Sequence, residues 1–247
     1  CPGTTTLLIP VGNTPTITAS SSPTSICAGS SATLSATGAT SYTWNPGAAT
    51  GSSVAVTPTS TTVYTVTGTT TLVCPGTKTV MVTVNTTPTL SAVSNPTGIC
   101  VGSTATLTST GATSYTWMPG SLSGGTVTVT PASTTVYTVT GSNGSCSSTK
   151  TVQTTVNSVP TVTASVSSST ICSGTSVTLT AGGATTYTWN PGSLTGATVV
   201  TTPTTNTTYT VIGSNGTCTN SALVSVTVNP SPTVTAVANP TAICSGA

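Results

Sequence analysis

The sequence predicts an all-β protein made of tandem antiparallel β-sandwich domains, each of about 72 residues, in a linear array. Three observations lead to this prediction. Cysteine, tryptophan and proline recur along the chain with one common step. Within each step, short runs rich in Val, Thr, Ile and Tyr alternate apolar with polar residues, and Gly, Pro, Asn or Ser clusters separate them, as in strands and turns. No segment has the apolar spacing of a helix.

Two series of cysteines mark the repeat. One is Cys27, Cys100, Cys172 and Cys244, the other is Cys1, Cys74, Cys146 and Cys218, and both advance by 73, 72 and 72 residues. Trp44, Trp117 and Trp189 keep the same step. We therefore predict repeats at 14–86, 87–158 and 159–230, with 1–13 as the C-terminal strand of a preceding repeat and 231–247 as the start of a following one. We expect the chain to belong to a longer array.

The third repeat shows how each unit is organised. Its pattern predicts strands at 161–164, 176–181, 186–189, 197–202, 207–212 and 222–228. Alternate residues on these strands face one side of a sheet, and those sides should meet as the core. The predicted aromatic core residues are Trp44, Trp117, Trp189, Tyr64, Tyr137 and Tyr209. On the last strand of each repeat, the residues expected beside them are Val82, then Val152, then Val224, Val226 and Val228. A Trp and a Tyr at these places suit the centre of an immunoglobulin-like sandwich.

Composition excludes most chemistry. The chain has two basic residues, Lys78 and Lys150, and no Asp, Glu or His, so no acid–base pair or carboxylate metal site can be assembled. The eight cysteines are never closer than 26 residues, so there is no paired-cysteine zinc motif. A net charge of +2 is too small to indicate nucleic-acid binding, and no apolar run is long enough to span a membrane. We expect no enzyme, no cofactor, no metal and no nucleic-acid partner.

Four segments together resemble a known family. They are Thr-Ser-Tyr-Thr-Trp-Asn-Pro-Gly at 40–47, Thr-Val-Tyr-Thr-Val-Thr-Gly at 62–68, Ile-Cys-Ser-Gly at 171–174 and Ser-Asn-Gly-Thr-Cys at 214–218. As a set they are similar to the PKD-like and Ig-like repeats of very large Bacteroidota surface proteins. The resemblance covers the whole chain and implies an exported adhesin of the gliding type or a fibre, sent out by the type IX route. Many such modules carry acidic loops that could hold calcium, and this sequence has none.

The even, periodic cysteines of a protein with these features predict disulfides. One pairing is within repeats, Cys27 with Cys74, Cys100 with Cys146 and Cys172 with Cys218, leaving Cys1 and Cys244 to outside partners. This pairing within repeats conflicts with the expected topology. Cys27 would lie in the loop between the first two strands, and Cys74 in a hairpin at the opposite end of the sandwich, too far away for a disulfide. The alternative crosses a junction, Cys27 with Cys146 and Cys100 with Cys218. Both pairings stay open here, and so does a bond between chains.

Two classes of function fit these features. The first is a structural repeat region of an extracellular filament or surface stalk, in which neutral Thr-rich surfaces let neighbouring copies of the protein associate into a filament or lateral bundle. The second is an adhesin whose Ser, Asn and Gly loops bind surface glycans, with ice binding by Thr rows as a lesser variant. Both place the protein outside the cell or on its surface, with an export signal expected beyond this sequence. Asn85, Asn143, Asn206 and Asn215 head glycosylation triplets.

Overall fold

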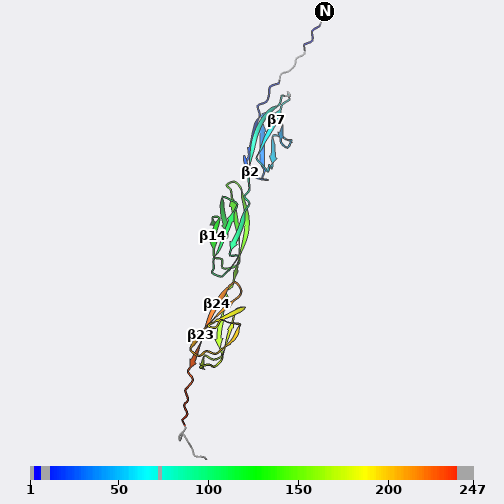
Figure 1. The fold of residues 1–247 in the computed structure, drawn as a ribbon. Coiled ribbons are helices and arrows are strands. Elements are labelled where there is room, and N and C mark those ends of the chain that lie inside the picture. The colour runs from blue at the N-terminus through cyan, green and yellow to red at the C-terminus, as the bar shows by residue number, and fades with distance from the viewer. Residues whose placement is uncertain (1–2, 7–11, 72–73, 238–247) are drawn as a thin grey trace, which may run out of the picture. The chain divides into compact units, whose positions relative to one another are not determined.

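The computed structural model describes residues 3–6, 12–71 and 74–237, and within them the chain is all strand, turn and irregular structure. These residues contain no helix, and so none that could cross a membrane. The strands come in three series of eight with the same order, visible as arrows in Figure 1. We use the word repeat for each series. The prediction of an all-β array of immunoglobulin-like sandwiches is confirmed, whereas the predicted domain bounds remain a prediction.

The first repeat consists of two facing sheets. Its strands are β1 (Thr18–Ser22), β2 (Ser25–Cys27), β3 (Ala32–Thr37), β4 (Ser41–Asn45), β5 (Ala49–Thr50), β6 (Ser53–Val56), β7 (Thr62–Thr69) and β8 (Gly76–Asn85). One sheet has the order β1-β3-β6, and the other has the order β2-β8-β7-β4-β5. All pairings are antiparallel except that of β2 with β8, which is parallel. A first strand divided between the two sheets in this way is an immunoglobulin-like arrangement.

The third repeat has the same topology. Its strands are β17 (Thr163–Val166), β18 (Thr170–Cys172), β19 (Val177–Gly182), β20 (Thr186–Asn190), β21 (Leu194–Thr195), β22 (Thr198–Thr201), β23 (Thr207–Ser214) and β24 (Thr219–Asn229). They form sheets of order β17-β19-β22 and β18-β24-β23-β20-β21, again with one parallel pair, β18 with β24. Five predicted strands fall largely on β19, β20, β22, β23 and β24, and the sixth, at 161–164, overlaps only the first two residues of β17. The sequence patterns missed β18 and β21, which have three and two residues and are too short to alternate.

The middle repeat follows the same order. Its strands are β9 (Ser91–Asn95), β10 (Gly98–Cys100), β11 (Ala105–Thr110), β12 (Ser114–Met118), β13 (Leu122–Ser123), β14 (Thr126–Val129), β15 (Thr135–Ser142) and β16 (Ser147–Asn157). They make sheets of order β14-β11-β9 and β10-β16-β15-β12-β13. The chain divides into two compact units, residues 1–94, 106–128 and 136–152 in one and the remaining residues in the other, so these strands are shared between the units.

Each sandwich is packed around a tryptophan on its third long strand. Trp44, Trp117 and Trp189 are fully buried, and Tyr64, Tyr137 and Tyr209 are buried as well. The indole N–H of each Trp donates to a backbone carbonyl seven residues later, for example from Trp44 to Gly51 at 3.0 Å. This bond satisfies the one polar atom that burial would otherwise leave unpaired. The largest side chains of each small domain are therefore inside it, and the burial of their apolar surface is the main source of its stability.

The predicted core positions on the last strand are not all fully buried. Val152, Val224 and Val228 are partly buried. The residue of the middle repeat equivalent to the buried Val82 and Val226 is Thr154, which is fully buried. Val152 lies two residues before Thr154 on β16. Residues two apart on a strand point to the same face, so alternation favours Val152 as strongly as Thr154. The sequence pattern alone cannot tell which of two alternate positions lies deepest.

A tyrosine at the start of β4, β12 and β20 closes the preceding turn. The hydroxyl of Tyr187 accepts a hydrogen bond from the N–H of Ala184 and donates to the carbonyl of the same residue, both at 2.7 Å. Tyr42 and Tyr115 make the same pair of bonds. The turn also needs glycine: Gly183 has a φ of +88°, and a side chain there would meet the carbonyl oxygen of Thr161.

The fold changes the pKa of two buried tyrosines. Burial raises the pKa of the Tyr64 and Tyr137 phenols above their ordinary value. There is no Asp, Glu or His whose pKa could differ between the folded and unfolded states.

We therefore expect the free energy of unfolding to be constant between about pH 2 and pH 7. The raised tyrosine pKa values mean that the folded state holds these protons more tightly, so their contribution is complete below about pH 10 and is lost as the pH rises further. Guanidinium denaturation midpoints at pH 2, 4, 7 and 11, with free thiols alkylated, check both statements. A midpoint that falls on acidification would contradict the first, and Tyr64→Phe should reduce the alkaline loss.

Candidate functional site

The cysteines form bonds that join one repeat to the next. Cys27 is bonded to Cys146 and Cys100 to Cys218, with Cα atoms 5.7 Å apart in both pairs. Of the two pairings that the sequence left open, this is the one across the junction. Cys74 and Cys172 have free thiols. Cys1 and Cys244 lie outside the described residues.

The position of Cys27 explains this pairing. The sequence placed Cys27 in a loop, but it is the last residue of β2, where it lies opposite Asn85 at the end of β8. The backbone N–H of Ala28 donates to the carbonyl of Asn85 at 3.3 Å, which extends the pairing by one residue. The cysteine is thereby held at the end of the repeat from which the chain passes on to the next one. In the middle repeat Cys100 lies opposite Asn157 in the same register.

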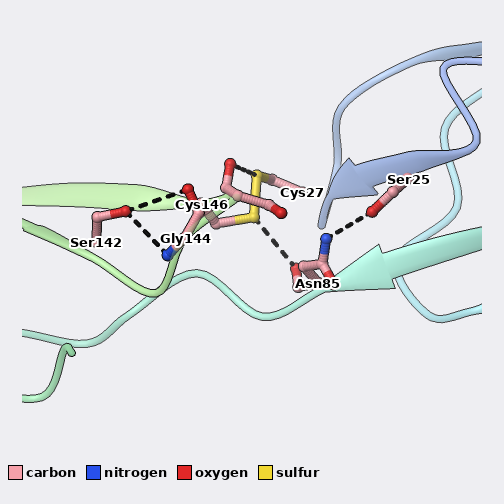
Figure 2. The surroundings of a disulfide bond; sticks show 7 residues. Ser25, Cys27, Asn85, Ser142, Gly144 and Cys146 are labelled. Carbon is pink, nitrogen blue, oxygen red and sulfur yellow. Dashed lines mark hydrogen bonds between the residues drawn. A yellow bond between two sulfur atoms is a disulfide. The ribbon is translucent and has the colours of Figure 1, made fainter. Parts of the chain in front are cut away.

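The partner cysteine comes from a tight turn between the last two strands of the following repeat. Asn143 N–H donates to the carbonyl of Cys146 at 3.0 Å, which closes the turn. Within it, Gly144 has a φ of +94°, and its N–H donates to the hydroxyl of Ser142 at 3.1 Å. Figure 2 shows this turn reaching the end of β2 and β8. The Asn-Gly sequence suits the left-handed backbone that such a turn requires.

Backbone carbonyls surround each disulfide. Sγ of Cys146 lies 3.7 Å from the carbonyl oxygen of Asn85, and Sγ of Cys27 lies 3.5 Å from that of Ser145. The Asn85 side-chain amide turns away and donates to the hydroxyl of Ser25 at 2.7 Å (Figure 2). At the second bond, Sγ of Cys218 is 3.7 Å from the carbonyl of Asn157, and Sγ of Cys100 is 3.7 Å from that of Thr217. Both junctions therefore have the same construction.

These junctions hold no reactive constellation. Within the described part of the chain, no three His, Cys, Asp or Glu residues are grouped as metal ligands would be. Lys78 and Lys150 are exposed. What the site provides is a covalent cross-link, and its chemistry is that of a disulfide.

Two hollows lie on the third repeat. One, of about 420 Å³, is lined by Tyr187 and by Thr, Gly and Ala residues on and beside β20 and β21. The other, of about 580 Å³, is lined by residues that include Ser173, Thr204 and Asn206 beside the end of β18. None of the nine aromatic side chains, all of which are described, is exposed. Neither hollow therefore offers an open aromatic face on which a sugar ring could stack.

No protein-family model and no curated protein matches this sequence. Among solved structures, the chain is similar to the I67–I69 fragment of the titin I-band, at 11% identity and a TM-score of 0.41, covering 83% of this chain and 95% of that one. It is also similar to the three N-terminal domains of the bacteriophage RB49 outer capsid protein Hoc, at 15% identity and a TM-score of 0.37, covering 88% and 100%. Drosophila OTK extracellular domains 3–5 match at 11% identity and a TM-score of 0.38, covering 83% and 93%. At these TM-scores the likenesses carry no argument, and the assignment of the sandwich rests on the strand pairings.

We expect peptide mapping of the non-reduced protein by mass spectrometry to recover Cys146 linked to Cys27, and Cys218 linked to Cys100. The register of β2 on β8 places Cys27 at the junction, far along the sandwich from the Cys74 turn, so the bond must cross to the next repeat. Recovery of Cys146 linked to Cys100 would contradict this arrangement. Reduction before digestion is the control for the linked peptides.

Proposed function

We propose that this chain is the structural repeat region of an extracellular filament or surface stalk, with no enzymatic activity. The observation that carries the proposal is that both disulfides join consecutive repeats instead of closing a single one. Disulfides of this kind persist in oxidising surroundings, which supports a location outside the cell. The resemblance to surface repeats of Bacteroidota supports the same location.

A cross-link at each junction changes what the junction can do. Two sandwiches joined only by a short Thr- and Pro-containing segment, such as 86–90, are free to bend relative to each other. A second covalent connection at the same place restricts the angles that they can adopt. An array of such junctions resists bending and transmits tension through two covalent paths, which are properties required of a stalk or filament.

The surface favours association between copies of the chain. On the outer face of the β7–β8 pair, Val63 and Met81 lie directly opposite each other and each is 54% exposed. Thr65 is paired with Thr79 next to them on the same face. Lys78 pairs with the buried Val66 and so lies on the opposite face of the strand. The outer face therefore has hydroxyls and apolar groups without this charge, and like-charge repulsion between copies is weak. We propose a second copy of the same chain as the partner of this face.

The alternative of a glycan-binding adhesin has less support. Its strongest element would be an exposed aromatic platform, and every Trp is buried in its own sandwich. The hydroxyl-lined hollow around Tyr187 offers hydrogen bonds alone. We therefore favour the structural role.

Junction stiffness can be measured with spin labels on Lys78 and Lys150, the only lysines, which lie in consecutive repeats. With the α-amino group acetylated, the distance distribution between the labels should be narrow in the oxidised protein. In Cys27→Ser/Cys146→Ser, residues 86–90 become a flexible linker, and we expect the distribution to broaden about twofold.

The matched control is Cys100→Ser/Cys218→Ser, which also loses one disulfide but at the other junction. It should leave the distribution between the two labels unchanged. Equal widths in the oxidised protein and in both variants would overturn the proposed stiffening role.

Association can be followed by sedimentation velocity over a range of protein concentrations. We expect the sedimentation coefficient to rise with concentration, and Val63→Lys/Met81→Lys to suppress the rise because it places two like charges on the associating face. Ser20→Lys/Ser52→Lys adds the same charge at exposed positions on and beside the other sheet, β1-β3-β6, and should still associate. Equal suppression by both variants would indicate a general effect of charge and would refute this face as the interface.

A further inference from the structure

The two free cysteines occupy the positions of bonded ones. Cys74 stands one repeat step before Cys146, and Cys172 stands one step after Cys100. Among the described residues, their counterparts Cys27, Cys100, Cys146 and Cys218 are all cross-linked. Cys74 is half-buried and Cys172 is exposed. Each is therefore one half of a bond whose other half would belong to a neighbouring repeat.

The surroundings of Cys74 match those of its bonded counterparts. Its thiol donates to the carbonyl of Gly12 at 3.3 Å. Sγ of Cys146 lies against the carbonyl of Asn85, and Sγ of Cys218 against that of Asn157, both at 3.7 Å. The three carbonyls are themselves separated by one repeat step. Cys74 is thus held against the segment preceding its repeat, as a cysteine that bonds to a preceding repeat must be.

The backbone around Cys172 has the same pairing as the backbone around Cys27 and Cys100. It is the last residue of β18 and lies opposite Asn229. The N–H of Ser173 donates to the carbonyl of Asn229 at 3.0 Å, as the N–H that follows each bonded cysteine donates to Asn85 or Asn157. Ser173, the residue that follows Cys172, lines the hollow of about 580 Å³ described above. At the other two junctions the residue that reaches this end of a repeat is a hairpin cysteine, Cys146 or Cys218.

We propose that Cys172 and Cys74 are complementary coupling groups, the first accepting a hairpin cysteine from a following repeat and the second a strand-end cysteine from a preceding repeat. The partner repeat is another unit of this type, in the same polypeptide or in a second copy. This rests on the proposed function only in that both invoke cross-linked junctions. In a mixture of chains, Cys172 of one copy therefore bonds to Cys74 of another, head to tail.

The coupling is a thiol–disulfide exchange with a small disulfide such as oxidised glutathione. The thiolate of Cys172 attacks one sulfur of the glutathione disulfide, forms a mixed disulfide and releases one glutathione thiol. The Cys74 thiolate then attacks the protein sulfur of that mixed disulfide and releases the second glutathione. Two protein thiols are oxidised, one glutathione disulfide is reduced to two thiols, and the two thiol protons leave with them.

The test uses the whole chain with Cys1→Ser/Cys244→Ser, which removes the two cysteines outside the described residues. Cys74→Ser and Cys172→Ser are each added to that background and incubated in a glutathione redox buffer, separately and mixed. We expect covalent dimer in the mixture at least about tenfold above either variant alone, because only the mixture holds both halves of the bond. Mapping should recover Cys172 linked to Cys74.

Dimer formed equally well by either variant alone, or no dimer in the mixture, would overturn the proposal. Recovery of the Cys27–Cys146 and Cys100–Cys218 peptides from every sample shows that the variants keep the fold. In material from the native source, Cys172 linked to Cys74 identifies a second copy as the partner, and Cys172 linked to a peptide foreign to this sequence identifies an adjoining repeat. A free Cys172 thiol there would also overturn the proposal. The spin-label experiment does not depend on these thiols, so failure of one result is distinguishable from failure of the other.

Discussion

The short parallel pairing between β2 and β8, repeated in β10 with β16 and in β18 with β24, determines where the covalent bonds of this chain lie. Each pairing is only three residues long and ends in a cysteine. It transfers that cysteine from the first sheet to the second and fixes it at the end of the last strand. Without this transfer the cysteine would stay in a loop, and nothing would hold it opposite the hairpin of the next repeat.

The sandwich core and the junction depend on different parts of each repeat. The core is built from residues that alternate along the long strands, with Leu34, Trp44 and Val66 fully buried in the first repeat. The junction is built from turns and strand ends, where backbone carbonyls and an Asn-Gly turn set the geometry. Because the surfaces carry almost no charge, side-chain contacts between strands are made by hydroxyls, such as Thr18 with Thr37 at 2.6 Å and Thr208 with Ser225 at 2.9 Å. Such pairs stabilise a sheet without ion pairs.

Much of the fold could be predicted because its signals repeat. The step of the cysteines and tryptophans gave the number of units, and alternation located the long strands, including β19, β20, β23 and β24. The three-residue strand β18 could not be found in the same way, because alternation needs more residues than it has. The position of Cys27, and therefore the choice between two disulfide pairings, depends on β2, the equally short strand at the same place in the first repeat. Likewise Thr154 in the core was hidden by a neighbouring valine that looked equally suitable.

The two disulfide loops also overlap. Cys27 and Cys146 are 119 residues apart and Cys100 and Cys218 are 118 apart, so each loop is longer than one repeat step, and residues 101–145 lie inside both. A single hydrolysed peptide bond anywhere between Cys27 and Cys218 therefore leaves two fragments that are still joined by at least one disulfide. Within the overlap they are joined by two. A protease that cleaves this part of the chain once breaks the polypeptide, but the disulfides keep the two fragments together.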